Sequence, residues 1–258
     1  MPSPSDRPRL CLIGDSHLGS VRLAETGGLV DFSGYDMEYW GAAGPSFRGL
    51  MLQDDRMVVR GAEAQEDFAR INGTGRTSVG PEDFDEYLLF GCRVCSFDFF
   101  GRYLQWKYGA HGWQSRAVLM RSAHSFLASS RAYRMGAIFA QKYGAKVSCI
   151  PVSLITADVV DHTQPGYFLD LHPDSVNATA EDRAWLWDVL VTAAAADGVT
   201  LISQPDETVV NGVFTDPRYA VDGAREKEDA DHKSPEFAAM MLGRWNASVL
   251  PDREAMRA

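Results

Sequence analysis

The fold of this chain is decided by the stretch Arg9-Leu10-Cys11-Leu12-Ile13-Gly14-Asp15-Ser16-His17. Residues 9–13 form a short apolar run that ends at a Gly-Asp-Ser turn, a pattern typical of a strand buried on both faces. An amphipathic segment, residues 17–25, follows at once and stops before Gly27-Gly28, as a helix would. A buried strand that leads directly into a helix is the first half of a β-α-β unit and predicts a parallel sheet.

The rest of the chain repeats this alternation of short β-rich runs and amphipathic stretches. Thr179, with Asp182 three residues later, is a candidate N-cap for a long helix. We expect further strands at residues 35–40, 87–90, 146–151 and 199–203, and helices at 116–143, 179–196 and 234–242. The pattern predicts an α/β fold, in which helices cover both faces of a central parallel sheet.

No internal repeat or polar linker divides the sequence, so we expect one domain over residues 1–258. Residues 49–85 are polar and rich in glycine, which suggests an insertion between the second and third strands. Residues 97–113 hold seven aromatic side chains. Either these rings cover one end of the sheet, or they form a lid-like wall in which Trp106 and Trp113 contact an apolar or sugar-like substrate.

Composition excludes several classes of protein. With 45% apolar and 23% charged residues, the chain is not a disordered segment. Its 25 basic and 35 acidic residues give a net charge of −10, which disfavours nucleic acid or an anionic membrane as a partner. No apolar run is long enough to span a membrane, and the run at Leu10–Ile13 is too short for a signal peptide, so we expect a cytoplasmic protein.

The cysteines do not form a recognisable metal or redox site. Inside the cell we expect Cys11, Cys92, Cys95 and Cys149 to be reduced thiols. Cys92 and Cys95 have CxxC spacing, but a zinc site needs a second such pair or suitably spaced histidines. The sequence offers neither, so no metal and no cofactor is expected.

Ser16 is the first candidate for chemistry, because it follows the first strand and precedes a helix. In an open parallel sheet, ligands bind at the carboxyl ends of the strands. The positive end of the helix that follows can stabilise an oxyanion beside this serine. Asp15 and His17 flank Ser16 and are candidates for substrate contacts.

A serine hydroxyl needs a base to become a nucleophile. His232 lies just before the last expected helix, and Asp229, three residues earlier, would share a face of a turn with it. The Asp229 carboxylate could hold Nδ1–H and leave Nε2 free as the base, whereas Asp231 would point elsewhere. Taken alone, however, this segment is better explained as a charged loop exposed to solvent.

The two ends of the chain together form one pattern: Gly-Asp-Ser after the first strand, glycine turns after the next two strands, and Asp-x-x-His before the last helix. This pattern resembles the SGNH, or GDSL-type, hydrolase family over residues 10 to about 242. The resemblance implies a flavodoxin-like three-layer α/β/α sandwich. It also implies a Ser16, His232 and Asp229 triad, with the backbone N–H groups of Ser16 and Gly44 in an oxyanion hole.

Two positions depart from the family pattern. Arg93, in Gly91-Cys92-Arg93-Val94, stands where the family has an asparagine that completes the oxyanion hole. Its guanidinium could replace that donor, bind a carboxylate or phosphate of the substrate, or pair with an acidic neighbour. His17 stands where the family usually has leucine, and it is either a second polar contact or a residue of the helix start.

The expected function is therefore hydrolysis of a carboxylic ester, an acyl or acetyl ester of a small molecule or glycan, through an acyl-enzyme. One alternative is an acyltransferase with the same triad, and another is a non-catalytic ligand-binding domain of this fold. The sequence does not fix the acyl length, the alcohol portion or the oligomeric state. For the remaining candidates, His111, His124, His162 and His172, we favour a structural or surface role.

Overall fold

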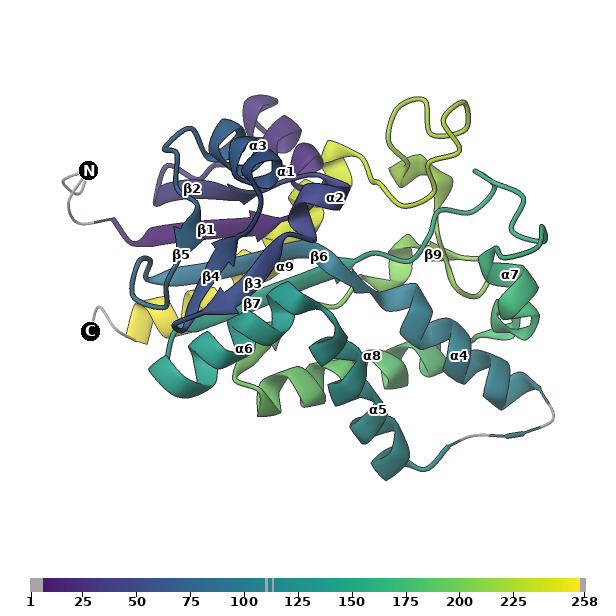
Figure 1. The fold of residues 1–258 in the computed structure, drawn as a ribbon. Coiled ribbons are helices and arrows are strands. Elements are labelled where there is room, and N and C mark those ends of the chain that lie inside the picture. The colour runs from purple at the N-terminus through teal and green to yellow at the C-terminus, as the bar shows by residue number, and fades with distance from the viewer. Residues whose placement is uncertain (1–6, 110, 113, 256–258) are drawn as a thin grey trace.

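The computed structural model describes residues 7–109, 111–112 and 114–255, and a five-stranded parallel sheet lies at its centre (Figure 1). The strand order is β2-β1-β6-β7-β8, which is the flavodoxin-like order when these five strands are counted along the chain. The strands are β1 (Arg9–Gly14), β2 (Asp36–Gly41), β6 (Glu86–Cys95), β7 (Lys146–Val152) and β8 (Val199–Leu201).

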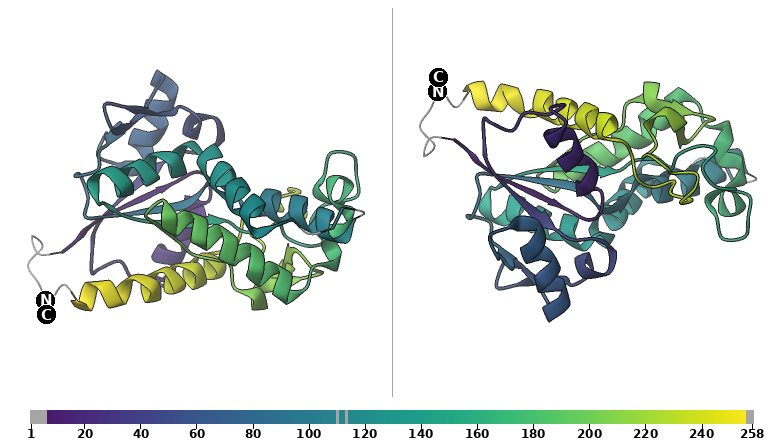
Figure 2. Two further views of the ribbon diagram at one scale, coloured as in Figure 1. Left: turned by 90° about the horizontal axis from the view of Figure 1, so that it is seen from below. Right: turned by 90° about the horizontal axis from the view of Figure 1, so that it is seen from above.

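Helices cover both faces of this sheet, so the fold is the predicted three-layer α/β/α sandwich (Figure 2). Strand β1 shows why its sequence is apolar throughout. Cys11 and Ile13 belong to the core cluster on one face, and Leu10 and Leu12 belong to the cluster on the other. Helices α1 (Leu18–Thr26) and α9 (Pro235–Ala255) cover the second face, while α4 (Ser96–Tyr108), α5 (Arg116–Ser129), α6 (Arg131–Tyr143) and α8 (Ala180–Ala196) contribute to the first.

The expected insertion is folded. After α2 (Gly44–Phe47), a small antiparallel sheet is formed by β3 (Leu50–Gln53), β4 (Arg56–Val59) and β5 (Ser78–Val79), with α3 (Ala62–Asn72) packed against β2. The remaining elements lie between β7 and α9: α7 (Phe168–Leu171), the hairpin β9 (Val209–Val210) and β10 (Phe214–Thr215), and 3-10 helices at Pro173–Asn177, Asp206–Thr208 and Pro217–Tyr219. None of the helices that the structure describes has both the length and the hydropathy to cross a bilayer.

The structure corrects the expected single helix over 116–143. Ser130 has an extended ψ of 124° and separates α5 from α6. Its hydroxyl accepts a hydrogen bond from the Tyr133 N–H and donates one to the Cys92 carbonyl, so it caps α6 and ties it to the end of β6. At Thr179 the predicted N-cap is confirmed, as a capping box with Asp182.

Half of the aromatic rings that the structure describes in residues 97–113 belong to the core. Phe99, Phe100 and Tyr103 on α4 are buried. Phe99 packs on Phe126 of α5 with ring centroids 5.3 Å apart, and Phe100 packs on Trp187 of α8 at 4.9 Å. These contacts agree with the interpretation that the rings cover one end of the sheet.

Candidate active site

The loop between β1 and α1 places Ser16 at the carboxyl edge of the sheet. Its side chain is exposed, and its carbonyl accepts the Gly19 N–H at 3.1 Å, within the first turn of α1. The Asp15 carbonyl accepts the Leu18 N–H in the same way. The serine therefore sits at the start of α1, where the positive end of the helix favours negative charge.

Ser16, His232 and Asp229 form a continuous hydrogen-bonded chain. The Ser16 Oγ lies 2.7 Å from Nε2 of His232, across 216 residues of sequence. The other ring nitrogen, Nδ1, lies 2.9 Å from each carboxylate oxygen of Asp229. Since an ionised carboxylate can only accept, Nδ1 carries the proton and Nε2 is left to accept the serine hydroxyl.

Asp229 is held as an anion by its own loop. It accepts the backbone N–H of His232 at 3.0 Å and that of Asp231 at 3.3 Å. Partial burial alone would raise the pKa of Asp229, but the hydrogen bonds and charge of His232 lower it below its ordinary value. The carboxylate is therefore charged at neutral pH and can stabilise a cation on the imidazole.

Lys233 stabilises the loop that carries Asp229 and His232. Its side chain is 5% exposed, and Nζ donates to the carbonyls of Ala230 and Asp231 at 2.9 Å each. The Thr156 N–H, after β7, also donates to Ala230. Burial lowers the pKa of Lys233 to about 7. Nothing in the sequence marks Lys233 for this role, because a lysine in a charged segment is ordinarily solvated.

Asp15, a candidate for substrate contact, links the serine loop to the end of β6. Its carboxylate is buried and accepts the backbone N–H groups of His17 at 3.2 Å and Arg93 at 3.1 Å. Burial raises its pKa, although these two hydrogen bonds oppose the shift. A Cβ at Gly91 would lie 2.9 Å from Asp15 Oδ1, and Gly91 has a φ of +74°, so glycine is needed where β6 approaches the serine loop.

The ring of His17 packs against the ring of His232. The centroids of the His17 and His232 rings are 4.6 Å apart, with 32° between the ring planes. Burial, followed by the charges of His232 and Lys233, lowers the pKa of His17 to about 3. His17 is therefore neutral at physiological pH and does not add a positive charge beside an imidazolium.

Gly44 and Arg93, which are expected in the oxyanion hole with Ser16, lie close to the carboxyl ends of the two strands that flank β1. Gly41, at the end of β2, pairs with Gly14 of β1, so the segment that leads to Gly44 runs beside the serine loop. Gly44 opens helix α2, where backbone N–H groups have no intrahelical partner. Arg93 lies near the carboxyl end of β6, the other neighbour of β1, where the pairing with β7 is irregular between Gly91 and Cys95. Its side chain is exposed and its φ is +57°.

Other predicted residues lie elsewhere. Trp106 is not brought to the triad: it is near the end of α4, ten residues or about 15 Å beyond the start of that helix, and its ring lies 6.0 Å from that of His111. Trp113 lies outside the described residues. His162 is buried, with Nε2 3.2 Å from the Thr156 carbonyl. His124 lies 3.7 Å from Asp197.

The four cysteines are free thiols. Burial raises the pKa of Cys95 and of Cys149 to about 12. No group of three or more His, Cys, Asp or Glu side chains within the described ranges is arranged to hold a metal ion.

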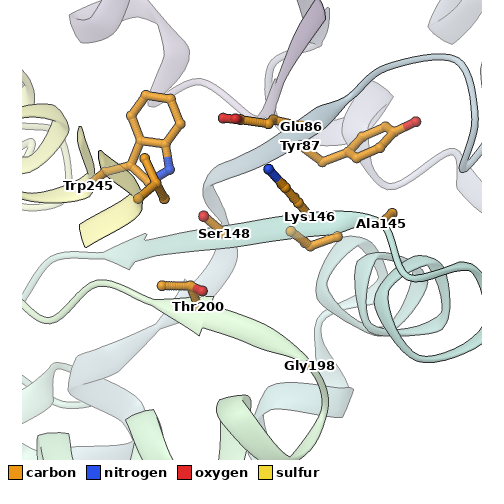
Figure 3. Close-up of a pocket in the computed structure, with 10 residues that line it drawn as sticks. Glu86, Tyr87, Ala145, Lys146, Ser148, Gly198, Thr200 and Trp245 are labelled. Atoms are coloured by element: carbon orange, nitrogen blue, oxygen red, sulfur yellow. The ribbon is translucent and has the colours of Figure 1, made fainter. Parts of the chain in front are cut away.

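Several pockets open on the surface. One of about 220 Å³ lies at the amino ends of β6 and β7, where Glu86, Lys146 and Trp245 line it (Figure 3). This is the edge of the sheet opposite the triad. Another, of about 340 Å³, is lined by Phe47, which ends α2, and by Arg93, whose backbone N–H donates to Asp15 of the serine loop.

Comparisons with known proteins add little to this geometry. No protein-family model matches the chain, and no curated protein matches it. A solved structure from Streptococcus pneumonia, provisionally described as a platelet activating factor, is 13% identical. The match covers 93% of this chain and 84% of that one, with a TM-score of 0.42. A likeness of this degree carries no information about activity.

Proposed function

We propose that this protein is a serine esterase that cleaves a carboxylic ester through an acyl-enzyme, as a member of the SGNH, or GDSL-type, hydrolases. The observation that carries the proposal is the chain of hydrogen bonds from Asp229 through His232 to Ser16, at 2.9 and 2.7 Å. Nucleophile, base and orienting carboxylate stand in the order that acyl transfer requires.

In the first half of the reaction, Ser16 Oγ attacks the ester carbonyl while Nε2 of His232 takes the hydroxyl proton. The anion of Asp229 stabilises the imidazolium, and the backbone N–H groups of Ser16 and Gly44 stabilise the oxyanion. Collapse of the tetrahedral intermediate breaks the bond to the alcohol oxygen, which takes the proton from His232. The alcohol leaves and the acyl group stays on Ser16.

In the second half, water enters and His232 accepts one of its protons. The resulting hydroxide attacks the acyl carbon, Ser16 Oγ leaves and recovers its proton from His232, and the carboxylic acid is released. His17 is neutral at the working pH and so adds no positive charge beside the imidazolium, which Asp229 stabilises. Asp15 and Lys233 position the two loops and take no part in proton transfer.

The proposal is tested by labelling with a fluorophosphonate and by hydrolysis of 4-nitrophenyl acetate. We expect label on Ser16 and release of nitrophenol, with kcat reduced by at least about 10³-fold in Ser16→Ala. Circular dichroism and thermal melting should show the variant folded. If the wild-type protein neither takes the label nor hydrolyses the ester, the proposal is wrong, and ligand binding without labelling would favour a non-catalytic binding domain. An acyltransferase would take the label but transfer the acyl group to an added alcohol faster than to water.

A further inference from the structure

A pocket of about 340 Å³ beside the serine loop is lined by arginine and serine side chains. It lies where α2, the end of β6 and the junction of α5 and α6 meet. Its lining is Phe47, Arg48, Cys92, Arg93, Ser129, Ser130, Arg131 and Ala132. The pocket is thus built from three segments far apart in the sequence.

The arginines of this pocket, Arg48, Arg93 and Arg131, form no ion pair with a carboxylate of the described residues. Arg131 instead donates to the backbone carbonyls of Arg48 at 2.6 Å and Leu50 at 2.9 Å, which fixes its guanidinium without cancelling the charge. Other arginines of this acidic chain do pair with carboxylates, as Arg183 does with Asp206 and Arg56 with Asp83.

The positive region continues away from the triad. A groove of about 540 Å³ shares Arg48 and Arg131 with the pocket and adds Arg60 and Arg134, which also lack a carboxylate partner among the described residues. Its other lining residues are mostly apolar: Gly49, Met51, Leu52, Met135 and Ile138. Five arginines without acidic partners, on a protein of net charge −10, form a local field that attracts anions.

The pocket is connected to the serine loop through Arg93. Arg93 lines it while its backbone N–H donates to Asp15, the residue before Ser16. Phe47 ends the short helix that Gly44 begins. A substrate whose ester carbonyl lies at Ser16 can therefore extend its alcohol portion past α2 toward Arg48 and Arg131.

We propose that this pocket binds a phosphate group on the alcohol portion of the substrate, so that the enzyme acts on acyl esters of phosphorylated compounds. The identification as a substrate subsite rests on the proposed esterase function. Guanidinium groups present paired N–H donors that match phosphate oxygens, and three of them around one pocket suit a dianion. The start of α6, which Ser130 caps, adds the positive end of a helix dipole.

The site is tested by calorimetric titration with inorganic pyrophosphate, which needs no turnover. We expect wild-type protein and Ser16→Ala to bind it equally, and Arg48→Gln and Arg93→Gln to bind at least about tenfold more weakly. Arg244→Gln, an exposed arginine of α9 outside the pocket, is the matched control and should bind as the wild type does. Absence of binding, or equal binding by Arg48→Gln and Arg244→Gln, would overturn the site.

The role in substrate recognition is tested with an acetylated sugar and its phosphorylated counterpart. We expect kcat/KM at least about tenfold higher for the phosphorylated ester, with the preference reduced in Arg48→Gln and kept in Arg244→Gln. Equal kcat/KM for the two esters would overturn the substrate role. Failure of the esterase function looks different: pyrophosphate would still bind, but neither ester would be hydrolysed and Ser16 would take no fluorophosphonate.

Discussion

Asp229 and Asp231 are two carboxylates in one loop, and only the first reaches the imidazole. Asp229 lies 2.9 Å from Nδ1 of His232, while the side chain of Asp231 is exposed. The sequence favoured Asp229 because residues three apart share a face of a turn, and the geometry of the loop agrees. The difference between the two is electrostatic as well as positional, since Asp229 accepts two backbone N–H groups that keep it ionised.

We predict that Asp229→Asn lowers kcat for an ester by roughly 10⁴-fold, because an amide cannot stabilise the imidazolium and favours the wrong ring tautomer. The rate is measured with 4-nitrophenyl acetate at pH 7.5. Asp231→Asn removes the same charge two residues away and should change kcat less than about threefold. Equal losses in the two variants would mean that the charge of the loop matters and the contact with His232 does not.

The end of β6 is the element that joins the triad to the positive pocket. Near the carboxyl end of this strand the backbone is left-handed at Gly91, Cys92 and Arg93. This left-handed stretch brings the Arg93 N–H to Asp15 and the Cys92 carbonyl to Ser130 at the start of α6. A strand end of ordinary geometry would direct these groups elsewhere.

We predict that Gly91→Ala costs about 1–3 kcal/mol of stability and also lowers kcat. The added methyl meets both Asp15 and His17 at 2.9 Å and so displaces the serine loop. Gly144, which ends α6, has a similar φ of +67° but open space around its Cβ, so Gly144→Ala is the matched control. It should lose stability by a similar amount in urea denaturation while keeping kcat. If both variants keep kcat, the close approach at Gly91 does not position Ser16.

Elements could be predicted from the sequence where a local pattern decides them. The buried strand at β1 is apolar throughout, and the N-cap at Thr179 carries its partner three residues on. The break at Ser130 could not be predicted, because it depends on a hydrogen bond to Cys92, 38 residues away. The positive pocket was missed for the same reason: only Arg93 was singled out, since nothing local marks Arg48 and Arg131 as neighbours.

At the scale of the molecule, the sandwich brings an early and a late segment of the chain to one edge of the sheet. The loop after β1 supplies Ser16, and the loop before α9 supplies Asp229 and His232. Lys233 lies at this junction, in a small pocket lined also by His17 and Ser20 near the start of α1, by Gly91 and by Phe237 of α9. The buried Lys233 side chain thus lies where the parts that must meet for the triad to form come together.

We predict that Lys233 makes the stability of the whole protein rise with pH above neutrality. Its folded pKa of about 7 lies below the ordinary value of 10.5, so between these two values the unfolded chain holds a proton that the folded protein has released. The free energy of unfolding therefore gains at most about 1.4 kcal/mol per pH unit from this group. Below pH 7 both states are protonated, and the cost of burying the charge is fully present.

Lys233→Met removes this titration along with two hydrogen bonds to the loop. Urea denaturation from pH 7 to 9.5 should show the wild type gaining stability relative to the variant as the pH rises. Lys227→Met, an exposed lysine of the same loop, should keep the wild-type slope. Parallel pH profiles for wild type and Lys233→Met would show that the buried amine keeps its proton. The junction between the chain ends would then have to hold a permanent cation, neutralised by Asp229 and Asp231.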